Sequence, residues 1–193
     1  MKKGLLIVFS GPSGVGKGTI RELFINRKEL NLAFSISMTT REPRPNEVDG
    51  RDYFFVSEEE FARHVENDGF LEYAEFVGNR YGTPKEQVEQ LRQQGKNVLL
   101  EIEVQGANQV QKSVPDALSI FIVPPSFEEL ERRIRGRSTE AEEIIQQRLA
   151  KASRELETMG QYKYIICNDD PILAADLTAL IIKRHSEVGL PSL

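Results

Sequence analysis

The sequence predicts an α/β fold in which helices cover both faces of a five-stranded parallel sheet. Apolar runs mark the five strands, which we expect at residues 5–9, 34–38, 97–102, 118–123 and 164–167. Polar segments of helical length separate the later runs, and such alternation is typical of parallel strands buried on both faces. The first run also leads through a glycine-rich turn into a helical pattern, which is the first strand–helix unit of such a sheet.

The composition suits a globular chain of one ordinary domain. Of its 193 residues, 39% are hydrophobic and 28% are charged, and the net charge is −5. Because both signs are interspersed, we expect no nucleic-acid surface, which would need a basic stripe. The N-terminal apolar run at residues 5–9 is too short for a signal peptide or a membrane span, so we expect a cytoplasmic protein without membrane contact. The lone cysteine, Cys167, fits a reducing compartment and is expected to pack in the core.

The glycine-rich turn has the spacing of a phosphate-binding loop. It reads Gly-x-x-x-x-Gly-Lys between a strand and a helix, the context in which this motif binds phosphate. Glycines let backbone N–H groups converge on an anion, and the start of the helix adds unpaired N–H groups. Lys17 supplies a mobile cation, whereas a turn that binds nothing is the alternative. We therefore predict a nucleotide-phosphate site at Gly11, Pro12, Ser13, Gly14, Val15, Gly16, Lys17, Gly18 and Thr19.

The residue after the lysine departs from the usual form of this motif. Gly18 stands where a Ser or Thr hydroxyl ordinarily ligates Mg²⁺. Thr19 follows, but one residue further along a helix its side chain points about 100° away. We therefore expect Mg²⁺ to be held mainly by nucleotide phosphates and water, with Thr19 at most in an outer shell and no firm direct protein ligand.

The segment 37–83 is interpreted as an insertion that forms a small mixed α/β lobe. It begins as a loop rich in Arg, Pro and Gly, with almost no apolar residues up to Asp52. Ser57, followed three residues later by Glu60, is the pattern of a capped helix. We expect strands of the lobe at 53–56, 70–76 and 79–82, and the core at 1–36 and 84–193.

Helices alternate with the later strands of the core. Pro84 suits the first turn of a helix, and Ser126 caps another. The segment 136–139 interrupts this second helix, and a long amphipathic helix begins at Glu140. The last helix is predicted from about residue 172 to about residue 187, with an inward face of Leu173, Leu177, Leu180 and Ile181.

A second group of donors suits a phosphate monoester. Arg41 and Arg44 flank a proline in the loop that opens the insertion, and Tyr53 and Tyr81 lie at strand ends of the lobe. Arginine forks and tyrosine hydroxyls are donors that match phosphate oxygens. On these residues alone, a solvated loop with incidental arginines is the alternative.

Several segments together resemble the signature segments of guanylate kinases. They are the phosphate loop and residues 37–44, 50–53, 79–83, 101–106, 133–148 and 168–170, in the family's order from about residue 5 to about residue 185. The resemblance implies one guanylate-kinase-like domain, with a three-layer P-loop kinase core, the insertion as the GMP-binding lobe and a helical lid at about 132–148. It implies in-line transfer of a phosphoryl group from ATP to GMP, and also to dGMP, with Mg²⁺ as cofactor.

The resemblance also implies roles for individual residues of the GMP site. Those that hold the GMP phosphate are Arg41, Arg44, Tyr53 and Tyr81, and those that surround the guanine are Ser37, Glu72, Thr83 and Glu103. Guanine presents a ring N–H and an amino group side by side, and one carboxylate accepts both, whereas adenine would leave Glu72 unpaired. Glu103 stands where the family often has Asp, so a contact with guanine and a contact with a Mg²⁺-bound water both stay open.

The arginine-rich break resembles the family's lid over ATP. Arg133 and Arg137 are four residues apart and share one face wherever the helix persists. With Arg148 they would neutralise charge on the transferring phosphoryl group, whereas a solvated stretch paired with nearby glutamates is the alternative. By resemblance, Asn168 lies beside the adenine. The residues expected to act in catalysis are Lys17, Arg44, Arg133, Arg137 and Arg148.

Two other functions stay open at this point. One is a kinase for another nucleoside monophosphate, and the other is a catalytically silent guanylate-kinase-like interaction module. Such modules often lack phosphate-loop or acceptor residues, but here Lys17, Arg41, Arg44 and Glu72 are all present. The oligomeric state, monomer or homo-oligomer, is open as well.

Overall fold

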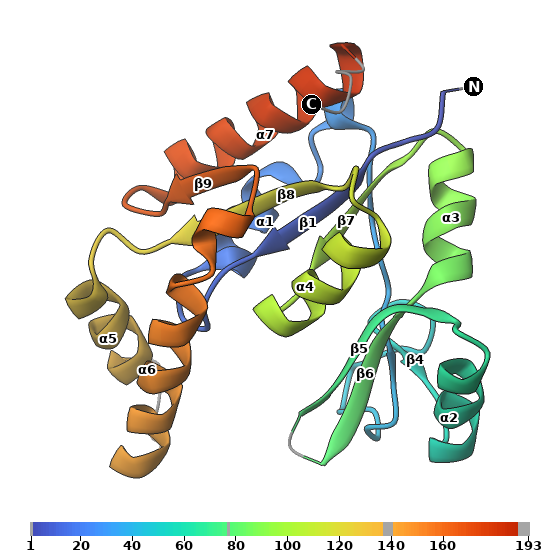
Figure 1. Ribbon diagram of the computed structural model, residues 1–193, viewed down its shortest axis with the longest axis horizontal. Helices are drawn as coiled ribbons and strands as arrows, with labels where there is room; N and C mark the ends of the chain where they lie inside the picture. Colours follow the sequence, from blue (N-terminus) through green and yellow to red (C-terminus); the bar gives the residue numbers. More distant parts are fainter. Residues whose placement is uncertain (1, 77, 137–140, 189–193) are drawn as a thin grey trace.

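The structure, a computed structural model, describes residues 2–76, 78–136 and 141–188 (Figure 1). Its central sheet has five parallel strands in the order β2-β7-β1-β8-β9. Their bounds are β1 Leu6–Ser10, β2 Leu32–Phe34, β7 Asn97–Glu101, β8 Leu118–Val123 and β9 Tyr164–Cys167. This sheet confirms the predicted fold class.

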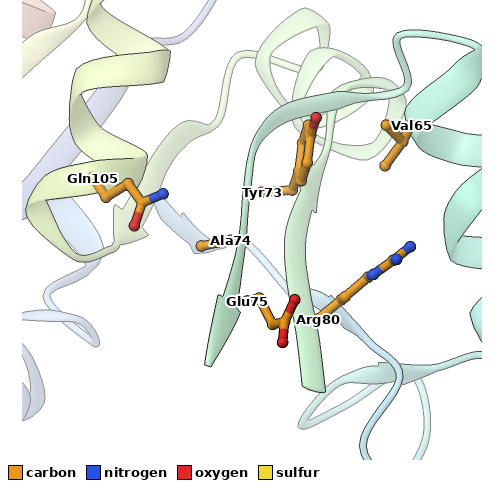
Figure 2. Close-up of a pocket in the computed structure, with 6 residues that line it drawn as sticks. All are labelled: Val65, Tyr73, Ala74, Glu75, Arg80 and Gln105. Carbon is orange, nitrogen blue, oxygen red and sulfur yellow. The ribbon is translucent and has the colours of Figure 1, made fainter. Parts of the chain in front are cut away.

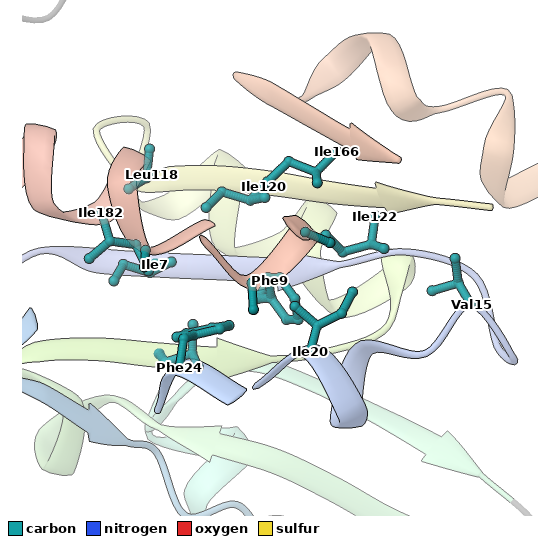
Figure 3. Close-up of a cluster of buried hydrophobic side chains, with 14 of the residues drawn as sticks. Ile7, Phe9, Val15, Ile20, Phe24, Leu118, Ile120, Ile122, Ile166 and Ile182 are labelled. Carbon is teal, nitrogen blue, oxygen red and sulfur yellow. The ribbon is translucent and has the colours of Figure 1, made fainter. Parts of the chain in front are cut away.

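Helices cover both faces of the central sheet because alternate residues of β1 point to opposite sides. Ile7 and Phe9 belong to one buried cluster, in which Figure 3 shows Phe24 close to Phe9. Leu6 and Val8 belong to a second cluster on the other side. The helices of the first side are α1 (Lys17–Phe24) and α7 (Pro171–Val188), and those of the second are α3 (Lys85–Gln93) and α4 (Val104–Ser113).

A second sheet of four strands, in the order β4-β3-β6-β5, lies with α2 in the inserted segment. Strands β3 and β4 run parallel, and β6 runs antiparallel to both β3 and β5. Met38, Phe61 and Phe70 pack between this sheet and α2. Ser57 Oγ accepts the backbone N–H of Glu60 at 3.1 Å, as the capping pattern predicts. The bounds are β3 Met38–Thr39, β4 Phe54–Phe55, β5 Phe70–Phe76, β6 Asn79–Pro84 and α2 Glu58–Glu66.

The predicted strand at 34–38 is wrong, because this run crosses from one sheet to the other. Just after β2 ends, the backbone N–H of Ser35 still donates to Leu99 O in the central sheet at 3.2 Å. Two residues later, Ser37 O accepts the N–H of Phe54 in the second sheet at 2.9 Å. The alternating polar and apolar residues therefore serve two different sheets.

Two helices after β8 extend from the core at lower left in Figure 1, while the second sheet and α2 extend at lower right. Ser126 Oγ accepts the N–H of Glu129 at 3.1 Å, which confirms the predicted cap. The predicted helix start at Glu140 lies outside the described residues. No helix in the described ranges is long and apolar enough to cross a membrane. The two helices are α5 (Phe127–Gly136) and α6 (Glu142–Leu156), and short 3-10 helices are η1 (Lys28–Leu30) and η2 (Met159–Gln161).

The predicted inward face of α7 is wrong for three of its four residues, whereas the fourth, Ile181, packs against the core as predicted. Leu173 and Leu180 are 58% and 64% exposed, and Leu177 is exposed as well. Small side chains let α7 pack closely against α1. The sequence of α7 has two adjacent apolar stripes, and the prediction chose the stripe with the larger side chains, which is exposed. The buried face consists of Ala174, Ala175, Thr178, Ala179 and Ile182.

Cys167 does not pack in the core, contrary to the expectation. It is exposed at the end of β9. This strand forms one edge of the central sheet, so part of it faces solvent. An apolar run on an edge strand does not distinguish buried positions from exposed ones.

Candidate active site

The phosphate loop joins the end of β1 to the start of α1. Three of its glycines have positive φ angles, 147° at Gly11, 86° at Gly14 and 97° at Gly16, a conformation that favours glycine. At Gly16 an added Cβ would also lie 2.6 Å from Nδ2 of Asn168. The backbone and the wall of the loop therefore both require the glycines that define the motif.

Lys17, the first residue of α1, lies against its own loop. Its Nζ donates to Gly11 O at 2.5 Å and to Pro12 O at 3.2 Å. Burial lowers the pKa of this ammonium group, and the carboxylates of Glu101 and Glu155 oppose that shift. The cation is thus held within reach of the loop by carbonyl oxygens and by acidic neighbours.

Two of the predicted lid arginines contact the phosphate loop. Arg133 Nη1 donates to Val15 O at 3.3 Å, and its Nη2 donates to Asn168 O at 3.1 Å. Arg148 Nη2 donates to Ser13 Oγ at 3.2 Å. These contacts join α5 and α6 to the loop through the same side chains that were predicted to act on ATP.

The alternative, in which the arginines pair with nearby glutamates, describes two other arginines of this region and in part Arg133, whose Nε pairs with Glu129 at 2.7 Å. Arg132 forms an ion pair with Glu129 at 2.7 Å, and Arg135 forms one with Glu142 at 2.6 Å. Both arginines are bound to acidic neighbours on the lid helices. Arg137, the third predicted lid arginine, lies outside the described residues.

Asn168 lies in the wall of the phosphate loop. It is buried, and its Nδ2 donates to Val15 O at 2.7 Å. Its Oδ1 is also buried and has no hydrogen-bond partner among the residues that the structure describes. The contact with adenine stays a prediction.

Arg41, Tyr53 and Tyr81 come together in the inserted segment. The Arg41 guanidinium lies 5.5 Å from the centre of the Tyr53 ring, and the ring centres of Tyr53 and Tyr81 are 6.0 Å apart. Glu47, which no sequence pattern singled out, accepts hydrogen bonds from Arg41 Nη2 at 2.8 and 2.9 Å and from the N–H of Arg44 at 2.8 Å. Glu47 therefore fixes the Arg41 fork beside the two tyrosines, while Arg44 is exposed.

Glu72 is a buried carboxylate between β5 and α4. It is 7% exposed, and Thr83, its register partner on β6, donates Oγ1–H to Glu72 Oε1 at 2.6 Å. Burial raises the pKa of Glu72, the hydrogen bond from Thr83 opposes the rise, and the charge of Glu103 adds to it. Gly106 leaves the necessary space, because an added Cβ there would lie 2.5 Å from Glu72 Oε2. No sequence pattern marked Gly106 for this purpose.

Glu103 is exposed at the position before the first residue of α4. Its Oε2 accepts a hydrogen bond from Lys151 Nζ of α6 at 2.5 Å. Sequence patterns did not single out Lys151, because only the tertiary structure joins these two segments. Ser37 is half-buried in the crossing between the two sheets.

A pocket of about 380 Å³ lies beside the β5–β6 hairpin, where it borders α4 and α2. In Figure 2, Gln105 of α4 extends toward Ala74, and Glu75 lies near Arg80, its register partner on the hairpin. None of the lining residues belongs to the phosphate loop or to the predicted site. The lining residues are Val65, Tyr73, Ala74, Glu75, Arg80 and Gln105.

The binding of Mg²⁺ stays a prediction. Within the described ranges, no group of three or more His, Cys, Asp or Glu side chains gathers where it could hold a metal ion. Gly18 offers no hydroxyl, and Thr19 is exposed.

Comparisons with known proteins agree with the resemblance in the sequence. The guanylate kinase family profile matches residues 3–177. The chain is 53% identical over 184 residues to a guanylate kinase of Streptococcus thermophilus (strain CNRZ 1066), covering 95% of this chain and 88% of the relative. It is 51% identical over 185 residues to one of Bacillus anthracis, covering 95% and 90%. The crystal structure of guanylate kinase from Anaplasma phagocytophilum is similar, with a TM-score of 0.73, 34% identity and coverage of 97% and 88%.

Proposed function

The chain belongs to the guanylate kinase family, and from this premise we propose how its own residues carry out the reaction. It is an ATP:GMP phosphotransferase, which transfers the γ-phosphoryl group of ATP to GMP and gives ADP and GDP. The observation that carries the residue assignment is a glycine-rich anion site on the core combined with a buried carboxylate in the inserted segment. We also propose a cytoplasmic location, which suits an exposed free cysteine.

ATP binds with its phosphates on the loop from Gly11 to Thr19. The positive φ angles at the loop glycines favour a concave backbone whose N–H groups point at an anion. The start of α1 adds its own unpaired N–H groups and the positive end of its dipole. Lys17 exchanges its carbonyl partners for the outer phosphates, and Asn168 borders the adenine.

GMP binds to the inserted lobe at 37–83. Arg41 and Arg44 with Tyr53 and Tyr81 hold its phosphate, and the hydrogen bonds from Arg41 to Glu47 support this role because they fix one guanidinium in advance. The guanine lies between Glu72, Thr83, Ser37 and Glu103. Because these contacts involve the base and the phosphate, we expect dGMP to be accepted too.

The reaction needs no general base. The attacking phosphate oxygen of GMP is largely deprotonated near neutrality, because the second pKa of a phosphate monoester is about 6. Catalysis is therefore alignment and charge stabilisation. Lys17, Arg133 and Arg148 stabilise the charge that develops on the transferring group, and Arg137 is proposed to join them. Closure of the lobe and the lid would exclude water, which otherwise competes as the acceptor.

A Mg²⁺ ion that accompanies ATP would be held mainly by the nucleotide phosphates and water, because the described part of the chain offers no firm direct ligand, and it would supply neutralisation of the phosphate charge. The residues fit such loose attachment, because Gly18 has no hydroxyl and Thr19 is exposed. Thr19 or Glu103 would contact the ion only through water.

Incubation of the purified protein with Mg-ATP and GMP is expected to give ADP and GDP in equal amounts. Anion-exchange chromatography separates and quantifies the four nucleotides. AMP, UMP and CMP serve as acceptor controls, and we expect each to react far more slowly than GMP. A faster reaction with one of them would favour a kinase for that monophosphate, and no turnover at all would favour the silent module.

Replacing Arg44 by Met is expected to raise KM for GMP by about 10- to 100-fold, since each charge-assisted hydrogen bond is worth about 1.5–3 kcal/mol. KM for ATP should change far less, because the residue lies in the acceptor lobe. Arg51→Met is the matched control, since Arg51 is an exposed arginine of the same segment, paired with Asp52. Equal losses for the two substrates would remove Arg44 from the acceptor site.

A further inference from the structure

We propose that Glu155, near the C-terminal end of α6, is a positioning residue that sets the phosphate loop and Lys17 for ATP. The proposal rests on the assignment of that loop as the ATP site. Glu155 belongs to no motif in the sequence, and the mechanism above does not use it. Its surroundings connect it to the donor site, that is, the ATP site at the phosphate loop.

The burial of Glu155 is unusual for a carboxylate. The residue is 8% exposed, and Oε2 is buried with no hydrogen-bond partner among the described residues. Its Oε1 lies 3.8 Å from Lys151 Nζ, which is long for an ion pair. Burying a charge that is incompletely paired costs free energy, so the fold alone would be better served by a neutral side chain. The carboxylate is therefore placed for something other than stability.

The groups that face Glu155 belong to the donor site and its border. Burial raises the pKa of Glu155. Lys151 and Lys17 oppose this rise by their charge, as does the backbone N–H of Ser13 by hydrogen bonding, while the charge of Glu103 adds to it. From the other side, Glu155 is among the carboxylates that favour the charged form of Lys17. The charge of Glu155 therefore acts on Lys17, the cation of the loop.

Glu155 shares one face of α6 with another residue that contacts the loop. Arg148, Lys151 and Glu155 follow each other at spacings of three and four, which places them on the same side of the helix. Arg148 Nη2 donates to Ser13 Oγ at 3.2 Å, so the face of α6 that also carries Glu155 contacts the phosphate loop. Lys151 joins the same face to Glu103 at 2.5 Å.

This arrangement gives the negative charge of Glu155 a functional role at the ATP site. A carboxylate on this face of α6 attracts the Lys17 ammonium by its charge and does so without touching the nucleotide. Because α6 also carries the lid residue Arg148, a movement of the lid helix would change the donor site directly. Removing the charge should therefore affect ATP and turnover, and should leave the affinity for GMP unchanged.

Glu155→Gln tests the proposal, because it keeps the shape and removes the charge. We expect kcat/KM for ATP to fall by about 10- to 100-fold, the loss typical of a slightly misplaced catalytic group, with KM for GMP unchanged. The melting temperature should stay equal or rise, since a raised folded pKa means that the ionised form costs stability at neutral pH. Loss of activity with no loss of stability is a result that a merely structural residue would not give.

The controls separate this proposal from its premise. Glu157→Gln removes an exposed carboxylate two residues along the chain and should match the parent enzyme. Glu155→Asp keeps the charge but draws it back from the loop, so a smaller loss is expected. The KM for ATP does not depend on the fraction of the enzyme that is folded, so it can be compared between the variants and the parent even if part of a variant misfolds. If the parent enzyme makes GDP and the Glu155→Gln variant has the same KM for ATP and the same kcat as the parent, the proposal is overturned and the proposed function stands. If the parent enzyme makes no GDP, the proposed function itself is contradicted.

Discussion

Replacing Lys17 by Met is expected to lower kcat by at least about 10³-fold, the range found for groups that stabilise a transferring phosphoryl group or an oxyanion. The physical reason is that Lys17 is the cation carried by the loop itself, and its Nζ lies 2.5 Å from Gly11 O. Met keeps the length of the aliphatic stem and removes the charge. Because burial lowers the pKa of Lys17, the fold disfavours its charged form, and its loss should not reduce stability.

Initial rates of GDP formation at saturating Mg-ATP and GMP measure this effect, and circular dichroism shows whether the variant is folded. Lys28→Met is the control, because Lys28 is an exposed lysine just beyond α1. The role assigned to Lys17 would be refuted by a folded variant that turns over within about tenfold of the parent.

The sequence predicts those parts of the fold that depend on local pattern. A strand buried on both faces is an unbroken apolar run, so most strands of the central sheet were located, and the phosphate loop is a contiguous motif. The run at 34–38 was misplaced because local alternation does not say which sheet each residue joins. The face of α7 was misplaced because leucine at 173, 177 and 180 is more apolar than alanine at 174, 175 and 179, although the smaller side chains permit closer packing.

The candidate site was predicted as far as motifs and family resemblance reach. Glu47, Gly106, Lys151 and Glu155 were missed, because each acts through a neighbour that only the tertiary structure supplies. Glu47 is the partial exception, since a carboxylate three residues after Arg44 is a signal for a local contact with that loop. The pairing of Glu72 with Thr83 depends on the hairpin register, which contains an irregularity between Phe70 and Glu72.

Replacing Glu72 by Gln is expected to lower the preference for GMP over AMP by about 10²-fold or more, because a site built to bond a donor pair rejects a base that lacks it. A carboxylate accepts from both the ring N–H and the amino group of guanine. Glutamine offers one acceptor and one N–H₂ donor, so it opposes the guanine amino group. The N–H₂ of the same amide can instead donate to N1 of adenine, which is an acceptor where guanine has its ring N–H.

The measurement is kcat/KM for GMP and for AMP with each enzyme. Glu75→Gln is the control, since Glu75 is an exposed carboxylate three residues along the same strand. If the ratio of the two substrates is the same for the parent and for Glu72→Gln, Glu72 does not read the base.

Because the pKa of Glu72 is raised, the same substitution should also change how GMP affinity and stability depend on pH. Guanine binding needs the ionised carboxylate, so GMP affinity should be lost as the pH falls through a pKa above the ordinary glutamate value of 4.5. The GMP phosphate titrates in a similar range, but this contribution is common to both enzymes, and the difference between them isolates the carboxyl group. Stability should change in the opposite sense, because a raised folded pKa gives stability at low pH that is lost as the pH rises through it. At neutral pH the Gln variant should therefore be at least as stable as the parent while binding GMP more weakly, since the carboxylate proposed to bind guanine is ionised at a cost to the fold.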